Sequence, residues 1–127
     1  MENKGPRNIG LSSIIHYRFP VTAISSILHR ISGILLFLFV PFVIWVLDIS
    51  LRDLSSFNQI KTCLSGWPSF FIWLFISSLA YHLFAGVRHL LMDIGLGEHK
   101  VSGRVGSYIV IVLGVLFAII FGVCLWA

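Results

Sequence analysis

Residues 66–87 read GWPSFFIWLFISSLAYHLFAGV, a run without a single Lys, Arg, Asp or Glu. Two other uncharged stretches, residues 31–47 and 105–127, lie on either side of it. A transmembrane helix needs about 17–25 mostly apolar residues to cross the hydrocarbon core of a bilayer, and each stretch falls within this range. The sequence therefore predicts three transmembrane helices.

The overall composition also indicates a membrane protein. Of the 127 residues, 57% are hydrophobic and only 11% are charged, and the mean hydropathy is +0.97. Soluble domains contain about 25% charged residues. We predict an all-α integral membrane protein with an N-terminal arm over residues 1–19 and one transmembrane domain over residues 20–127, with spans at about 22–50, 66–93 and 104–127.

The net charge of +4 carries information on topology. The basic residues are spread along the chain without the pattern of a nucleic-acid site, so nucleic acid is not an expected partner. Four precede the uncharged stretch 31–47, two lie in the first loop and three flank the second uncharged stretch on its C-terminal side: Lys4, Arg7, Arg18 and Arg30, then Arg52 and Lys61, then Arg88, Lys100 and Arg104. The positive-inside rule therefore predicts a cytoplasmic N-terminus and second loop.

Two further patterns predict structure and carry no chemistry. In the first loop, apolar residues recur every three or four positions, which favours a short helix in the membrane interface: Leu51, Leu54, Phe57, Ile60 and Leu64. In the third span, Gly114, Ala118 and Gly122 form a stripe of small residues. Such a stripe allows close helix packing, within this chain or against another.

His82 is the residue of the second span that most needs an explanation. An imidazole at bilayer depth is costly to place and is by default a functional-site candidate. The small residues Ala85 and Gly86 share its helix face and leave room for a flat macrocycle. The pattern favours His82 as a metal ligand to a b-type haem. A hydrogen-bonded core histidine and a proton relay remain open as alternatives.

Polar residues also gather where the first two spans approach the cytoplasm. If haem is present, Arg88 and His89 are candidate partners for its propionates; the alternative is a cluster of snorkelling side chains at the membrane interface. Ser26, His29 and Arg30 share one face of the first helix. This face suits a quinone head group, or is simply the polar start of a helix.

Arg30 and Arg88 are both expected near the cytoplasmic boundary, and His82 lies six residues before Arg88. Because His29 is next to Arg30, helical rise places it about 9 Å nearer the cytoplasm than His82. The two histidines should therefore not share one iron, and a second axial ligand should come from another subunit. No HExxH, CxxC, Walker or GxGxxG motif occurs in the sequence. Self-contained hydrolysis, nucleotide binding and hydride transfer are therefore unsupported.

The segments RFPVTAISSILHRISG (residues 18–33) and AYHLFAGVRHLLMD (residues 80–93) resemble the cytochrome b membrane-anchor subunit of succinate dehydrogenase, respiratory complex II. The resemblance implies one helical bundle shared by several subunits. It implies that Ser26, Ile27 and Arg30 line a ubiquinone site. It also implies that His29 and Arg30 lie near the haem propionates and that His82 is an axial ligand of haem b.

The same resemblance implies the partners. These are a second small membrane-anchor subunit that supplies the other axial ligand, an iron–sulfur subunit, a flavoprotein subunit, ubiquinone and membrane lipid. The chain would pass electrons from succinate oxidation to quinone in a bacterial inner membrane, and would not be an enzyme alone. Two alternatives stay open: the anchor of a quinol:fumarate reductase, and a non-redox membrane scaffold.

Overall fold

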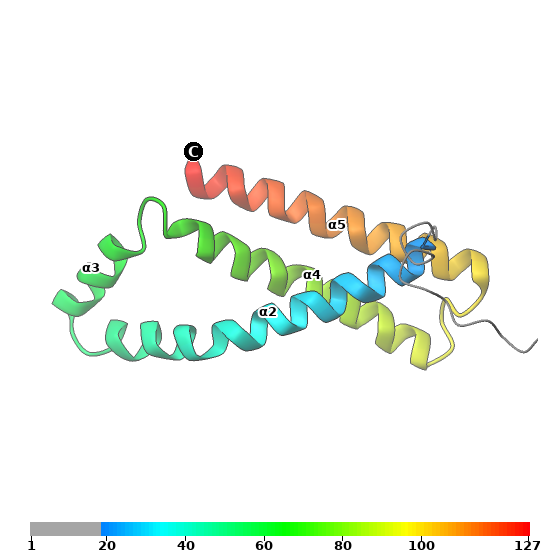
Figure 1. The fold of residues 1–127 in the computed structure, drawn as a ribbon, viewed down its shortest axis with the longest axis horizontal. Helices are drawn as coiled ribbons and strands as arrows, with labels where there is room; N and C mark the ends of the chain where they lie inside the picture. Colours follow the sequence, from blue (N-terminus) through cyan, green and yellow to red (C-terminus); the bar gives the residue numbers. More distant parts are fainter. Residues whose placement is uncertain (1–18) are drawn as a thin grey trace, which may run out of the picture.

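The computed structural model describes residues 19–127, which form four helices (Figure 1). The arm predicted for residues 1–19 lies outside the described residues except for Phe19. Helices α2 (Val21–Ser50), α4 (Ser69–Asp93) and α5 (Lys100–Trp126) are long and apolar enough to cross a membrane. Helix α3 (Leu54–Cys63) is short. The predicted all-α fold with three transmembrane helices is confirmed.

Helix α2 begins directly after Pro20, which is the N-cap residue in an extended conformation, with φ of −63° and ψ of 151°. The carbonyl of Pro20 accepts the amide of Ala23 at 2.9 Å. The helix has 30 residues, which corresponds to about 45 Å. It exceeds the hydrocarbon thickness, so part of it must lie in the headgroup region or against another protein.

The connections use side-chain capping and glycine turns. The carboxylate of Asp53 accepts the amide of Ser56 at 2.7 Å and caps α3, so the short helix predicted for the first loop is present. Gly66, with φ of +74°, turns the chain toward α4. Gly95 and Gly97, with φ of +83° and +84°, turn it toward α5. Glycine adopts these left-handed angles without steric cost.

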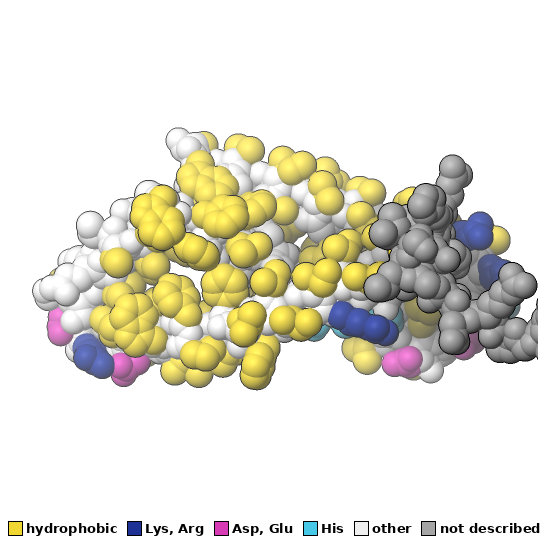
Figure 2. Space-filling model, viewed as in Figure 1, with side chains coloured by type: hydrophobic (Ala, Val, Ile, Leu, Met, Phe, Trp, Pro, Cys, Tyr) yellow, Lys and Arg dark blue, Asp and Glu magenta, His cyan; other side chains and the backbone are white. Residues whose placement is uncertain are grey.

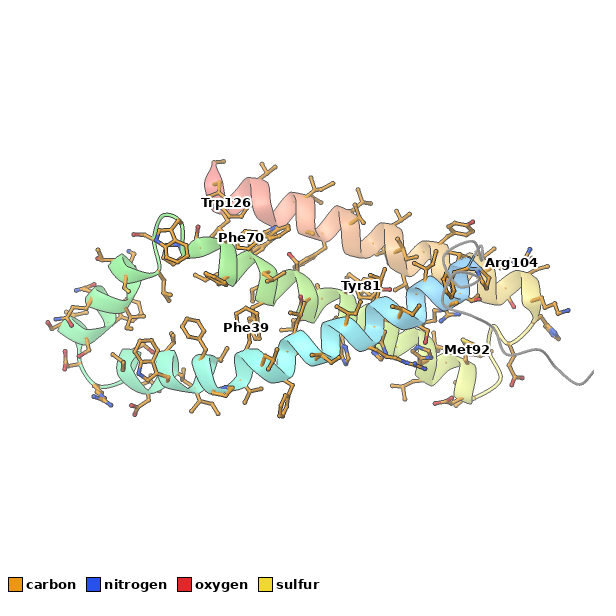
Figure 3. All side chains as sticks on the ribbon, viewed as in Figure 1. Phe39, Phe70, Tyr81, Met92, Arg104 and Trp126 are labelled. Atoms are coloured by element: carbon orange, nitrogen blue, oxygen red, sulfur yellow. The ribbon has the colours of Figure 1, made fainter. Side chains whose placement is uncertain are left out.

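Helix α4 packs against both α2 and α5, and α2 crosses α4 so that its first turns lie beside α5 (Figure 1). A Cβ added at Gly114 of α5 would come 2.6 Å from Cδ2 of Tyr81, a side chain at the meeting point of α2, α4 and α5 (Figure 3). Nε1 of Trp73 donates to the carbonyl of Ala118 at 2.8 Å. The small-residue stripe of α5 therefore packs against α4 of the same chain. This is one of the two arrangements expected from the sequence.

The interior is made of small side chains and the exterior is apolar. Within residues 19–127, Ala85 and Val110 are the only hydrophobic residues that are buried. Figure 2 shows hydrophobic side chains covering much of the visible face, with charged groups near the two ends. This surface suits contact with lipid or with other membrane helices. In the same part of the chain, the buried polar residues are all serines: Ser25, Ser32, Ser69, Ser78 and Ser107.

Candidate functional site between helices α2 and α4

The side chain of His82 on α4 is held by two groups of α2. Its Nδ1 lies 3.0 Å from Oγ of Ser32 and 3.2 Å from the carbonyl oxygen of His29. The hydroxyl of Ser32 donates to the same carbonyl at 2.7 Å. One imidazole nitrogen, one hydroxyl and one carbonyl therefore form a closed group of hydrogen bonds.

This arrangement selects one tautomer of His82. The carbonyl of His29 can only accept, and the single proton of the Ser32 hydroxyl is used on that carbonyl. The Ser32 oxygen is then free to accept from Nδ1. Nδ1 must therefore carry the proton, and Nε2 carries the lone pair. Ligating histidines are commonly oriented in this way, by an Nδ1–H that donates to a carbonyl or carboxylate.

Nε2 of His82 faces away from this network. Nε2 has no hydrogen-bond partner among the residues that the structure describes, and the atom is accessible rather than buried. The His82 side chain as a whole is half-buried. Its lone pair is thus not used within residues 19–127 and is accessible for a further interaction.

His29 packs directly against His82. Their ring centroids are 4.1 Å apart with an interplanar angle of 19°, and His89 is tilted against His29 at 5.1 Å. Nε2 of His29 is buried without a hydrogen-bond partner among the described residues. The expected separation of about 9 Å between His29 and His82 is therefore wrong. Two stacked rings still cannot approach one iron from opposite sides. That another subunit supplies the second axial ligand therefore stays a prediction.

The register of the two helices explains the error. Helices α2 and α4 run in opposite directions. A Cβ added at Gly33 would lie 3.1 Å from Cε1 of His82, and one at Gly86 would lie 3.8 Å from Nε2 of His29. These pairs place Arg30 about one turn deeper than Arg88. Treating the two arginines as one level had exaggerated the distance between the histidines.

The predicted quinone residues lie near the start of α2, on its more exposed side. Ser26 is half-buried, while Ile27 and Arg30 are exposed, and none of the three side chains makes a hydrogen bond or ion pair within residues 19–127. The neighbouring Ser25 is different, because it is buried and its carbonyl accepts the phenol of Tyr81 at 3.1 Å. Ser26 and Arg30 are thus free to contact a molecule outside this chain.

Arg88 lies on the side of α4 that faces α5, away from the contact between His82 and α2. Its guanidinium donates to the carbonyl of Gly103 on α5 at 3.1 Å, and a Cβ added at Gly106 would come 3.3 Å from its Nε. The structure therefore brings His29, His82 and His89 together but does not bring Arg88 to them. A role of Arg88 beside a haem propionate stays a prediction.

Comparison with known proteins identifies the family. Residues 10–121 match the family described as succinate dehydrogenase/fumarate reductase transmembrane subunit. The chain belongs to this family. The resemblance inferred from the segments around Arg30 and His82 is confirmed.

Individual relatives agree with this assignment. A Coxiella burnetii protein named succinate dehydrogenase cytochrome b556 subunit is 38% identical over 99% of this chain and 100% of its own length. A Rickettsia prowazekii protein of the same name is 33% identical over 82% of each chain. A Reclinomonas americana protein named succinate dehydrogenase cytochrome b560 subunit is 37% identical over 82% of this chain and 76% of its own length.

Ser32 is the site residue that sequence reasoning missed. Its signal was present, because it is a serine in an apolar helix, three residues after His29. A serine at this spacing can donate to the carbonyl one turn earlier. The sequence does not state how α2 is rotated, however, and that rotation decides whether the hydroxyl meets α4.

Proposed function

We propose that this chain is a membrane-anchor subunit of a succinate:ubiquinone oxidoreductase, which helps to bind one b-type haem and forms part of the ubiquinone-reduction site. One observation carries the proposal: Nδ1 of His82 is fixed by Ser32 and His29, while Nε2 is open to a group from outside the chain. The relatives named cytochrome b556 and b560 subunits support the same conclusion.

The residues around His82 fit a haem. His82 would supply one axial ligand, and the second small membrane-anchor subunit would supply the other. Bound haem would supply a one-electron redox centre at this depth of the membrane. His29, whose buried Nε2 has no hydrogen-bond partner within residues 19–127, and the exposed Arg30 would hold the propionates. Arg88 is a further candidate, although its guanidinium already donates to Gly103.

The quinone site would use the exposed face of α2 near its start. The hydroxyl of Ser26 would donate to a quinone carbonyl oxygen, and Arg30 would stabilise the negative charge that develops there during reduction. Ile27, which is 43% exposed, would contact the apolar part of the ring. These three residues lie within about one helical turn and have no competing partner in the described structure.

The remaining subunits follow from the proposed activity. A flavoprotein subunit would oxidise succinate, and an iron–sulfur subunit would pass the electrons to quinone beside this anchor. With the N-terminus cytoplasmic in a bacterial inner membrane, the quinone site would lie at the cytoplasmic edge. The family also covers fumarate reductases. A ratio of succinate oxidation to fumarate reduction in isolated membranes distinguishes the two directions.

The visible spectrum of the purified complex tests the haem proposal. The dithionite-reduced complex should show the sharp bands of a low-spin haem. His82→Leu should abolish or shift these bands, whereas His89→Gln, one heptad later on the same helix, should retain them. Identical bands in the wild-type complex and in His82→Leu would contradict the assignment of His82.

A further inference from the structure

We infer that Ser32 is a positioning residue for His82: its hydroxyl fixes the imidazole through Nδ1 and strengthens electron donation from Nε2 to bound iron. This inference rests on the proposed haem site and adds to it a residue that touches neither haem nor quinone. It concerns the redox properties of the site and not only its assembly.

Ser32 is enclosed between the helices, with 5% of its surface exposed. Its oxygen is shared between two interactions, as donor to the carbonyl of His29 at 2.7 Å and as acceptor from Nδ1 of His82 at 3.0 Å. Because bulk water has little access to this position, no solvent molecule readily replaces the hydroxyl. The orientation of His82 relative to α2 therefore depends on Ser32 together with the carbonyl of His29, which lies 3.2 Å from the same Nδ1.

The electronic consequence follows from the direction of these bonds. A hydroxyl that donates to a carbonyl becomes a better acceptor, because hydrogen bonds in a chain polarise one another. A stronger acceptor on Nδ1–H raises the basicity of the opposite nitrogen, Nε2. A more basic ligand stabilises the ferric state relative to the ferrous state. The hydroxyl of Ser32 should therefore lower the midpoint potential of the haem.

The chain offers a matched control in Ser25. It lies two helical turns before Ser32 on the same face of α2 and is also buried, with 1% of its surface exposed. Its hydroxyl lies 3.4 Å from the phenol of Tyr81 and does not contact His82. Removing either hydroxyl deletes the same atoms from the same interface, so a difference between the two variants reports the contact with Nδ1.

The experiment compares the purified complex carrying Ser32→Ala, Ser32→Thr or Ser25→Ala with the wild-type complex. The readouts are the haem midpoint potential by redox titration, the electron paramagnetic resonance spectrum of the ferric haem, and the ratio of haem to flavin. Ser32→Ala should raise the midpoint potential, alter the ferric spectrum and weaken haem retention by about tenfold. Ser32→Thr keeps a hydroxyl that can bond the same carbonyl and should remain close to wild type. Ser25→Ala should leave all three readouts unchanged.

The outcomes separate this inference from the haem proposal. Equal potentials and spectra in Ser32→Ala, Ser25→Ala and wild type would overturn the role of Ser32 while leaving His82 as a ligand. Loss of haem from all three variants would show a packing requirement and would also overturn it. Loss of haem from Ser32→Ala alone, with retention in Ser32→Thr and Ser25→Ala, would support it. A wild-type complex without haem bands would overturn the haem proposal itself.

Discussion

Gly33 on α2 and His82 on α4 face each other so closely that a methyl group on Gly33 would lie 3.1 Å from Cε1 of the imidazole. A glycine in the interior of a helix is less favourable than alanine by about 1 kcal/mol. The space that it leaves for His82 explains its presence here. The imidazole is thus held by Ser32 on one edge and is limited by the backbone at Gly33 on another.

Gly33→Ala should therefore disturb His82. His82 cannot easily give way, because its Nδ1 is held by Ser32 and by the carbonyl of His29. Overpacking of about 1–3 kcal/mol should therefore offset the gain in helix propensity of about 1 kcal/mol. We expect a lower unfolding temperature of the complex and altered haem bands. Gly86→Ala is the control, because its Cβ would meet Nε2 of His29 only at an ordinary 3.8 Å. Equal behaviour of the two variants would mean that His82 does not lie against Gly33.

Ser26→Ala and Arg30→Leu should lower quinone reduction by about 10- to 100-fold, the cost of losing one hydrogen bond to a charged group. Succinate oxidation with a soluble artificial acceptor should remain near wild type, because that reaction does not use the anchor. Ser25→Ala removes a hydroxyl at the adjacent, inward-facing position and should affect neither assay. Equal losses in both assays would indicate failed assembly and would count against a quinone site at Ser26.

Gly114→Val should weaken the contact between α4 and α5. The added Cβ would lie 2.6 Å from the ring of Tyr81, and that ring is anchored by its bond to the carbonyl of Ser25 at 3.1 Å. A destabilisation of about 1–3 kcal/mol is expected, measured as a lower thermal unfolding midpoint of the complex. Val115→Ala, at the exposed neighbouring position, should change the midpoint far less. A wild-type midpoint for Gly114→Val would refute this packing.

The cap of α3 should depend on pH. The backbone amide and the hydroxyl of Ser56 hold the pKa of Asp53 below its ordinary value. The cap therefore stabilises α3 fully above the ordinary carboxyl range and is lost as the pH falls through the lowered pKa. Amide hydrogen exchange across α3, corrected for intrinsic rates, should show protection that decreases in acid. Asp53→Asn, which caps without ionising, should lose this dependence.

Much of the fold could be predicted because membrane spans have a strong signal. The length of the uncharged stretches alone predicted the helices α2, α4 and α5. The spacing of Leu54, Phe57 and Ile60 indicated α3. The glycine stripe of α5 also predicted close packing. Which helix would pack there could not be predicted, because the pattern of one helix does not name its neighbour.

The site was less predictable. His82 stood out because an imidazole in lipid is costly, but its bonds to Ser32 and His29 depend on the rotation and register of two separate helices. Counting residues from Arg30 and Arg88 gave the wrong relative depth for the histidines. Helical rise fixes positions along one helix only, and the offset between two helices is set by packing at pairs such as Gly33 and His82.

A density map of the intact membrane complex tests the central claim most directly. The account predicts a tetrapyrrole beside α2 and α4, with its iron bonded to Nε2 of His82 and with Nδ1 still directed to Ser32. A map in which the His82 ring contacts only protein or lipid, with no tetrapyrrole beside it, would contradict the account.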